Sequence, residues 1–195
     1  MYKRQDNEFK LLLPKIAKNI GYTSGLVENL LYWSKSQLSG MVTDPTSVDI
    51  FAMTEMTLEA FADMIIGKDL KVINQIRPGT LVLCDKHMLQ AIFRNLITNA
   101  IKFCNTGNKI SISCDIEGNM ATIKVADTGI GISEENLSKL FASQTFTTMG
   151  TINEKGTGLG LLLCKDFVEK NNGKIWVESV LNQGSTFYFS LPVAI

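Results

Sequence analysis

Apolar residues recur along this chain with two different periods, which predict both helices and strands. Between residues 86 and 104 they return every three or four positions, and Asp85 stands where the N-cap of a helix belongs. Between residues 121 and 125 they alternate with other residues, which is typical of a strand with one buried face. We therefore predict a long amphipathic helix followed by a half-buried strand. The apolar positions of this helix are Leu89, Ile92, Phe93, Leu96, Ala100 and Phe103.

The same criteria predict the other elements between residues 45 and 193. Strands are expected at 48–50, 70–75, 81–83, 109–116, 120–126, 175–180 and 186–191, and helices at 51–66, 134–140 and 159–170. Residues 171–173 are expected to end the last helix, and residues 182–184 to close the final hairpin. Asp44 and Pro45 mark a turn, where we place the boundary between a first segment, 1–44, and a domain, 45–195.

The first segment has a heptad-like apolar seam, which predicts a long helix of the kind found in helical bundles. Gly21 and Gly25 weaken an isolated helix by about 1 kcal/mol each, so we expect this helix to need a partner. The alternative is an ordinary amphipathic helix that docks on its own domain. The seam consists of Leu13, Ile16, Ile20, Thr23, Val27 and Leu30.

The composition limits the classes of protein to which this chain could belong. The chain has 195 residues, of which 45% are apolar, enough for one substantial core. The 19 basic and 19 acidic residues balance, which leaves no basic surplus for nucleic acid. We find no run of about 18 apolar residues and no signal peptide, and we expect a soluble, cytoplasmic fragment without a membrane span. Cys84, Cys104, Cys114 and Cys164 form no Cys-x-x-Cys pair, so buried, reduced thiols are expected.

A glycine-rich turn precedes the helix predicted at 159–170. In the sequence KGTGLGL, residues 155–161, three glycines alternate with other residues. Such a turn lets backbone N–H groups approach an anion closely, and the positive end of the helix dipole favours the anion. The turn is therefore a candidate phosphate site, with Lys155 as a further contact. The alternatives are a glycine turn that caps a helix without a ligand, and an exposed lysine.

The long helix carries three polar residues beside its apolar stripe. At roughly 100° per residue, Asn95, Asn99 and Lys102 fall within about 60° of one another. Amide oxygens suit a hard cation such as Mg²⁺ that shares phosphate oxygens, and a lysine supplies a point charge for phosphate. The alternative is a solvated helix edge.

Asp127 stands at the end of the alternating strand and is followed by Thr128-Gly129-Ile130-Gly131. A half-buried carboxylate accepts hydrogen bonds only, and the exocyclic amino group of adenine is a suitable donor. The two glycines would let a purine lie close to the backbone. A β-turn of the Asp-x-Gly type explains these glycines equally well.

Together, these segments resemble the nucleotide-binding boxes of sensor histidine kinases, in the family's order and spacing. Residues 95–103 (NLITNAIKF) resemble the N box and residues 127–131 (DTGIG) the G1 box. Leu140, Phe141 and Phe146 resemble the F box, and residues 156–160 (GTGLG) the G2 box. The resemblance covers roughly residues 45–193. It implies a Bergerat-type, two-layer α+β fold, with a mixed sheet covered by helices on one face, and ATP held beneath a lid at 141–155.

The resemblance also implies roles for single residues. Asn99 would bind Mg²⁺, Asn95 and Lys102 would lie at the phosphates and the metal, and Asp127 would bind adenine. The catalytic set is thus Asn95, Asn99 and Lys102. The remaining ATP-binding residues that it implies are Phe103, Gly129, Gly131, Ile132, Phe146, Lys155, Gly156, Thr157, Gly158, Leu159, Gly160, Leu161 and Thr186.

The chain departs from two sequence patterns of related ATPases and kinases, and both departures bear on the reaction that it would catalyse. Gyrase and mismatch-repair ATPases have a glutamate, which activates water, four residues before the metal-binding asparagine. Asn95 occupies that position here, and an amide is no general base, so transfer to an external acceptor is favoured over hydrolysis. Histidine kinases phosphorylate a histidine in a His-(Asp/Glu)-x-x-x-Pro-like helix. His87, the only histidine of the chain, is followed by Met-Leu-Gln-Ala and lacks this motif.

The resemblance therefore implies a sensor-kinase catalytic domain that transfers the γ-phosphoryl group of Mg-ATP to a histidine on a helix absent from this chain. Its first segment resembles the second dimerisation helix, which implies a homodimer, a phosphoacceptor helix and a response regulator receiver domain as partners. These residues leave open whether a longer protein that contains this chain has a membrane anchor elsewhere. The alternatives are a nucleotide-responsive binding module without phosphotransfer and a serine kinase on the same fold.

Overall fold

The computed structural model describes residues 43–141, 148–152, 154 and 158–194. The chain divides into two units, Met1–Met41 and Val42–Ile195. The long helix predicted in the first segment, and most of the predicted lid, lie outside the described residues. The boundary that we placed after residue 44 stays a prediction.

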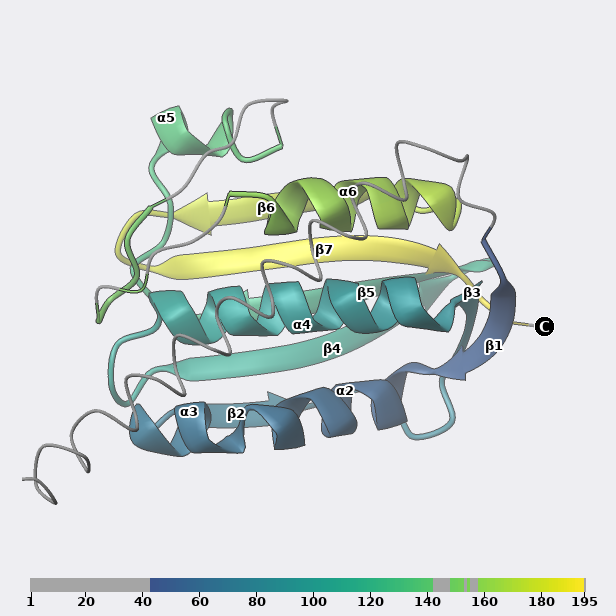
Figure 1. Ribbon diagram of the computed structural model, residues 1–195, viewed down its shortest axis with the longest axis horizontal. Coiled ribbons are helices and arrows are strands. Elements are labelled where there is room, and N and C mark those ends of the chain that lie inside the picture. Colours follow the sequence, from purple (N-terminus) through teal and green to yellow (C-terminus); the bar gives the residue numbers. More distant parts are fainter. Residues whose placement is uncertain (1–42, 142–147, 153, 155–157, 195) are drawn as a thin grey trace, which may run out of the picture. The chain divides into compact units, whose positions relative to one another are not determined.

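The second unit alternates helices and strands in the predicted order (Figure 1). Helix α4 begins directly after Asp85, whose side chain accepts hydrogen bonds from the backbone of His87 and Met88, so the predicted N-cap is confirmed. The elements are β1 (Pro45–Asp49), α2 (Ile50–Ala60), α3 (Ala62–Gly67), β2 (Lys71–Asn74), β3 (Leu81–Asp85), α4 (Lys86–Phe103), β4 (Lys109–Glu117), β5 (Met120–Asp127), α5 (Glu134–Leu137), α6 (Gly160–Lys170), β6 (Ile175–Val180) and β7 (Gly184–Pro192).

Among the described residues, the strands form a five-stranded sheet and a two-stranded ribbon. The order in the sheet is β2-β4-β5-β7-β6; β2 and β4 are parallel, and every other neighbouring pair is antiparallel. The ribbon pairs β1 with β3, and an isolated bridge between Val82 and Val193 joins it to the end of the sheet. Helices α2, α4 and α6 cover one face of the sheet (Figure 1). The predicted two-layer α+β fold with a mixed sheet is therefore confirmed.

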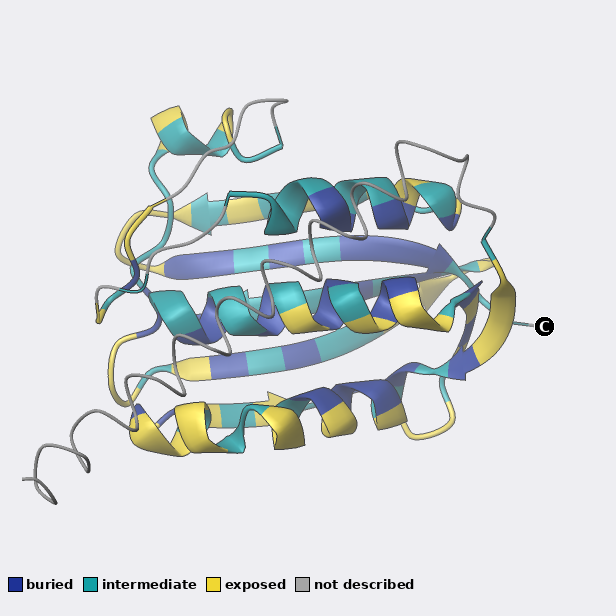
Figure 2. Cartoon of the chain, in the orientation of Figure 1, coloured by how far each residue is buried: buried dark blue, intermediate teal, exposed yellow. Residues whose placement is uncertain are grey.

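The core lies between α4, α6 and the inner face of the central strands (Figure 2). On β5, the odd-numbered residues face the helices, as the alternation in the sequence predicts, and the odd-numbered residues of β7 do the same. The rings of Phe93 on α4 and Phe189 on β7 meet edge to face, with their centres 5.6 Å apart. Five of the six apolar positions predicted for α4 are buried; Phe103, at its end, is half-buried.

Three local predictions were wrong in detail. The helix expected at 51–66 is broken at Phe61, which leaves helical geometry at φ −110° and ψ 14° and separates α2 from α3. Ile66 continues the apolar period of the predicted helix, but its side chain is 75% exposed. The first strand starts earlier than expected, at Pro45, which fits the first position of an edge strand because proline has no N–H to donate. Cys114 is partly exposed, unlike the three other cysteines, because burial falls off toward the end of β4.

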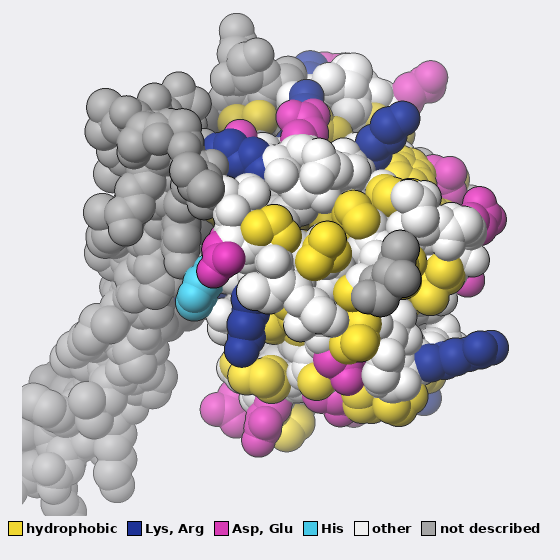
Figure 3. All heavy atoms as spheres, turned by 90° about the vertical axis from the view of Figure 1, so that its right-hand side faces the viewer, with side chains coloured by type: hydrophobic (Ala, Val, Ile, Leu, Met, Phe, Trp, Pro, Cys, Tyr) yellow, Lys and Arg dark blue, Asp and Glu magenta, His cyan; other side chains and the backbone are white. Residues whose placement is uncertain are grey.

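The end of the domain formed by β1 and β3 presents hydrophobic side chains to solvent (Figure 3). Leu81 and Leu83 of β3 are 41% and 43% exposed. The single histidine, His87, also lies on this face and is exposed. None of the described helices combines the length and the apolar character needed to cross a membrane.

A buried amide joins the two helices that flank the predicted phosphate site. Asn171, at the end of α6, is 4% exposed. Its Oδ1 accepts a hydrogen bond from the backbone N–H of Asp85 at 2.7 Å, and its Nδ2 donates to the carbonyl oxygen of Phe167 at 2.7 Å. The C-terminal end of α6 is thereby fixed to the start of α4.

Replacing this amide should destabilise the domain. We expect Asn171→Ala to lower the free energy of unfolding by roughly 2 kcal/mol, because a buried N–H is left without its acceptor. Urea unfolding followed by circular dichroism measures this loss. Asn105→Ala is the control, because Asn105 is exposed, and its effect should stay within about 0.5 kcal/mol. Equal effects of the two substitutions would contradict the account.

Candidate functional site

The predicted polar residues of α4 lie along one half-buried edge of the helix. Asn95 donates from Nδ2 to the carbonyl oxygen of Ala91 at 3.0 Å. Its Oδ1 would be 2.8 Å from a Cβ atom built on Gly160, so Asn95 faces the first residue of α6. The side chain of Asn99, one turn later, makes no hydrogen bond to any residue that the structure describes. Its amide is therefore available to a ligand.

Lys102 ends this edge and is directed toward residues 148–154. Its Nζ donates to the carbonyl oxygen of Thr148 at 2.9 Å and lies 4.7 Å from the ring centre of Phe103. Burial lowers the pKa of Lys102; the carboxylate of Glu154 opposes this shift, and the charge of Lys68 adds to it. The edge of α4 thus runs from the start of α6 to the described part of the predicted lid, residues 148–152 and 154.

The C-terminal end of α4 is held by a buried lysine that sequence reasoning missed. Lys68 follows α3 and is 6% exposed. An ammonium group at this position satisfies carbonyl groups that a helix leaves unpaired and balances the negative end of its dipole. The acceptors of Nζ are the carbonyl oxygens of Ile101 (2.9 Å), Lys102 (3.1 Å) and Cys104 (3.2 Å) and the hydroxyl oxygen of Thr151 (2.8 Å).

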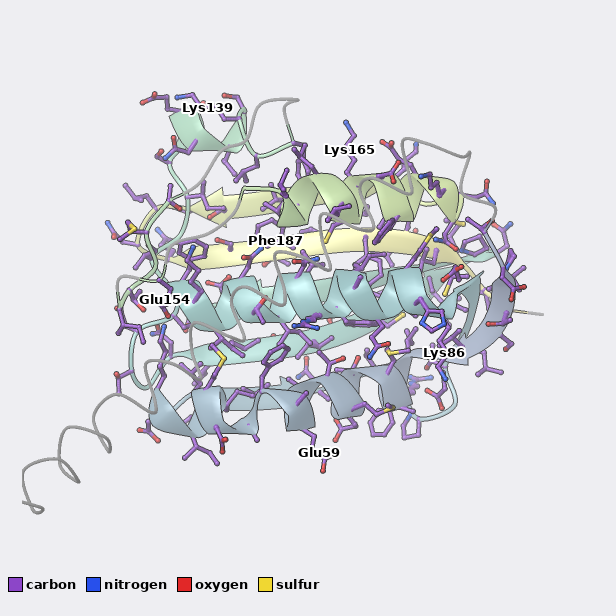
Figure 4. All side chains as sticks on the ribbon, viewed as in Figure 1. Glu59, Lys86, Lys139, Glu154, Lys165 and Phe187 are labelled. Atoms are coloured by element: carbon purple, nitrogen blue, oxygen red, sulfur yellow. The ribbon has the colours of Figure 1, made fainter. Side chains whose placement is uncertain are left out.

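Glu154 completes this cluster. Its Oε1 lies 3.2 Å from Nζ of Lys68, but the ammonium has only three protons and already faces four oxygens, so the attraction is ionic. Its Oε2 accepts from the backbone N–H of Ile152 at 2.9 Å. Burial acts against the charged form of Glu154, but the backbone N–H groups and Lys68 outweigh it, and the pKa lies below its usual range. Figure 4 places Glu154 beside the C-terminal end of α4.

Asp127 lies at the end of β5 on the side of the helices and is 9% exposed. Its Oδ1 accepts from the backbone N–H of Gly129 at 2.8 Å. Burial raises the pKa of Asp127 to about 6, although hydrogen bonds from the backbone of Gly129 and Ser185 act in the opposite direction. A buried carboxyl with unused acceptor capacity fits a donor such as an exocyclic amino group.

The glycines after Asp127 have a packing reason of their own. A Cβ atom on Gly129 would lie 2.4 Å from the carbonyl oxygen of Phe103, the acceptor of the Ile130 N–H at 3.1 Å. Gly131 has a φ of +65°, and a Cβ there would lie 2.1 Å from the carbonyl oxygen of Val180. Contacts within the protein therefore explain both glycines without a purine. Ile132 is half-buried, and its N–H donates to Oγ of Ser179 at 2.8 Å.

Thr186 does not share the face of the sheet on which Asp127 lies. On β7, Thr186 pairs with Ala126, and it lies on the outer face of the sheet together with Tyr188. Ser185 pairs with Asp127 instead and is 6% exposed. Side chains alternate along a strand, so the inward positions Phe187 and Ser185 belong together. Phe187 and Phe189 are apolar, so the alternation of β7 places Ser185, two residues before Phe187, on the same inward face.

The glycine-rich turn is described only from residue 158 onward. Gly158 has a φ of +75°, Leu159 is the N-cap of α6, and Gly160 and Leu161 open the helix beside Asn95. A Cβ atom at Gly160 would lie 2.8 Å from Oδ1 of Asn95, so a side chain at this position would displace the Asn95 amide from its present position. Outside the described residues lie Phe146, Lys155, Gly156 and Thr157.

One hollow adjoins Asp127 and Ser185 but not the polar edge of α4. It has a volume of about 260 Å³ at the β6–β7 hairpin and is lined by residues such as Glu178, Val180 and Thr186. Asp127 contributes to its wall, but no residue of α4 or α6 does. We therefore do not assign the predicted phosphate-binding residues to this hollow.

The arrangement suits an anion together with a hard cation. The N-terminal end of α6 offers backbone N–H groups that no described side chain caps, Lys102 offers a positive charge, and Asn99 offers a neutral oxygen. No group of three His, Cys, Asp or Glu side chains in the described part of the chain could hold a metal on its own.

Comparisons with known proteins agree with this geometry. The family model described as histidine kinase-, DNA gyrase B-, and HSP90-like ATPase matches residues 84–195. Adaptive-response sensory kinase SasA of Crocosphaera subtropica is 34% identical over 172 residues, a match that covers 86% of this chain and 44% of SasA. The chain thus spans less than half the length of this relative.

Solved structures have the same fold. The catalytic domain of histidine kinase ThkA, in a nucleotide-free form, matches with a TM-score of 0.67 and 26% identity, covering 76% of this chain and 95% of that domain. Histidine kinase ThkA in complex with the response regulator protein TrrA matches with a TM-score of 0.71 and 23% identity, covering 92% of this chain and 49% of that one. The predicted Bergerat-type fold and the resemblance to histidine kinase catalytic domains are confirmed. The family model covers more than half of the chain, and this chain therefore belongs to the family of histidine kinase-, DNA gyrase B- and HSP90-like ATPases.

Proposed function

We propose that this chain is the catalytic and ATP-binding part of a sensor histidine kinase. The observation that carries the proposal is the approach of α6 to α4, which brings the turn at Gly158 and Gly160 beside Asn95 on the half-buried polar edge of α4. Asn99 is available on that edge, and Lys102 ends it. The family match and the likeness to the ThkA catalytic domain support the same function.

Each residue has a proposed role in this function. The N-terminal N–H groups of α6 and the ammonium of Lys102 bind phosphate oxygens. Asn99 contributes an oxygen ligand to Mg²⁺, which would neutralise phosphate charge when bound, and Asn95 orients the phosphates from the α6 side. Asp127 accepts a hydrogen bond from the adenine amino group. We assign Ser185, in place of Thr186, to the ATP-binding residues, because only Ser185 lies beside Asp127 on the face of the sheet that the helices cover.

In the proposed reaction, a ring nitrogen of an external histidine bonds to the γ-phosphorus of ATP. The bond from that phosphorus to the β,γ-bridging oxygen breaks, and ADP leaves. Asn95 cannot deprotonate water, which favours this transfer over hydrolysis. His87 is exposed in the first turn of α4, at the opposite end from Lys102, and we do not propose it as the acceptor.

The partners belong to the same proposal. SasA is named as a sensory kinase, and ThkA has been solved in complex with the response regulator TrrA. We infer that the intact protein contains a phosphoacceptor helix, dimerises through the helix predicted in residues 1–44, passes its phosphoryl group to a receiver domain, and works in the cytoplasm.

Metal-dependent ATP binding tests the role of Asn99. Asn99→Ala should weaken ATP binding in Mg²⁺ by roughly tenfold or more, through loss of a bond to a charged group, and should change binding in EDTA by less than about twofold. Isothermal titration calorimetry measures both. Gln90→Ala, at an exposed position of α4, is the control and should bind like the wild type. An unchanged metal dependence in Asn99→Ala would remove Asn99 from the site.

The raised pKa of Asp127 predicts pH-dependent ATP binding. The folded protein holds an extra proton between the ordinary pKa of 3.8 and about 6, so this group makes the fold less stable as pH rises through that window. Only the ionised form, which is half populated at about pH 6 and predominates at higher pH, accepts from the adenine amino group without a competing proton. ATP affinity should therefore fall as pH is lowered from 7.5 to 5.

Asp127→Asn supplies the control for this pH profile. It keeps an acceptor oxygen and cannot titrate, while the phosphates of ATP titrate equally in both experiments. The difference between wild type and variant should show a midpoint near pH 6. Parallel profiles of the two proteins would place adenine away from Asp127.

Phosphotransfer distinguishes a kinase from a nucleotide-responsive module. The chain alone should neither label itself with γ-phosphate nor hydrolyse ATP quickly. Fused to, or mixed with, a phosphoacceptor helix, it should form an acid-labile, base-stable phosphohistidine that requires Mg²⁺ and Asn99. A folded, ATP-binding fusion that never labels this histidine would refute the kinase and leave the nucleotide-responsive module.

A further inference from the structure

The cluster around Lys68 has no part in the function proposed so far. Lys68 is a charged side chain that is 6% exposed, and the oxygens around it belong to two different segments. Three are carbonyl oxygens at the end of α4, and the others are the hydroxyl of Thr151 and the carboxylate of Glu154. A buried ammonium is retained only where such oxygens surround it. Lys68 therefore holds Thr151 and Glu154, and with them residues 148–152, against the end of α4.

Thr151 and Glu154 reinforce this junction from the other side. The Thr151 hydroxyl lies 3.1 Å from the carbonyl oxygen of Lys102 and 2.8 Å from that of Cys104, and its N–H donates to the carbonyl of Lys102 at 3.1 Å. The main-chain oxygen of Glu154 accepts from the N–H of Gly150 at 2.9 Å. These bonds fix the position of Gly150 relative to α4.

Gly150 in turn determines where the Lys102 side chain runs. A Cβ atom on Gly150 would lie 2.5 Å from Cγ of Lys102 and 2.4 Å from Oε2 of Glu154, so the lysine stem passes directly over this glycine. At its tip, Nζ of Lys102 donates to the carbonyl of Thr148. Both ends of the Lys102 side chain therefore lie on the segment that Lys68 and Glu154 hold.

We propose that Lys68 and Glu154 are positioning residues: their ion pair holds residues 148–152 and 154 against α4 and thereby places the ammonium of Lys102 for the phosphates of the nucleotide. This inference rests on the proposed function, in which Lys102 binds phosphate. Lys68 and Glu154 act through Lys102 and do not touch the nucleotide themselves. Their removal affects the binding of phosphates and leaves the binding of the nucleoside unchanged.

The test compares ATP with adenosine in the whole chain. Glu154→Gln keeps the size of the side chain and removes its charge, and Thr151→Val removes the hydroxyl at constant shape. Each should weaken ATP binding in Mg²⁺ by roughly 3- to 10-fold, the effect of one misplaced charged contact, and leave adenosine binding within about twofold. Glu135→Gln, which breaks the exposed ion pair with Lys139 on the surface, should change neither.

A double-mutant cycle distinguishes positioning from a general loss of structure. In a Lys102→Met background, Glu154→Gln should have almost no further effect on ATP binding, because the group that it positions is gone. Circular dichroism confirms that each variant is folded. Lys68→Met should behave like Glu154→Gln in the same assays.

Three results would overturn this inference, provided that the wild type binds ATP. The first is that Glu154→Gln and Thr151→Val bind ATP as the wild type does, and the second is that the variants lose ATP and adenosine binding equally. The third is that Glu154→Gln weakens ATP binding in the Lys102→Met background as much as it does in the wild type. A wild-type chain that binds no ATP would instead refute the proposed function itself.

Discussion

The C-terminal end of α4 depends on one buried positive charge. Burying an ammonium group costs several kcal/mol unless oxygens replace its water, and the last carbonyls of a helix are otherwise unpaired and carry partial negative charge. Lys68 and the end of α4 satisfy each other's requirement, with three carbonyl oxygens within 3.2 Å of Nζ. The remaining carbonyl at this end, that of Phe103, accepts from Ile130 in the loop after Asp127. Three segments distant in sequence therefore meet at one helix end.

This junction explains how the site is assembled on a single helix. The apolar stripe of α4 packs on the sheet, where Phe93 meets Phe189, and fixes the rotation of the helix. With this rotation, Asn95 lies against α6 and Lys102 against residues 148–154. Asn171 fixes the other end of α6 to the start of α4. The polar edge between these contacts is held by the core behind it, as a site that binds charged groups requires.

Much of the fold could be predicted from the sequence, because periodicity reports directly on burial. The alternation in β5 and the apolar stripe and N-cap of α4 were confirmed, and β7 is a strand as predicted. The break at Phe61 was missed because the apolar period continues through Met64 and Ile66, which are exposed. Periodicity alone does not reveal whether a packing partner exists.

The site was predictable where its residues lie on one element and not where it depends on contacts between elements. Asn95, Asn99 and Lys102 share an edge of α4 through helical spacing alone. The register places Ser185, and not Thr186, opposite Asp127, and the alternation of β7 already contained that information. The contacts of Lys68 with Thr151 and Glu154 cross more than 80 residues, and no local pattern marks them.

The most direct test of the account is a crystal structure of this chain with Mg²⁺ and a non-hydrolysable ATP analogue. The account predicts phosphates between the edge of α4 and the N-terminal end of α6, with Asn99 at the metal, Lys102 at a phosphate and adenine at the Asp127 carboxylate. A nucleotide bound instead in the hollow at the β6–β7 hairpin, against Glu178 and Thr186, would contradict it.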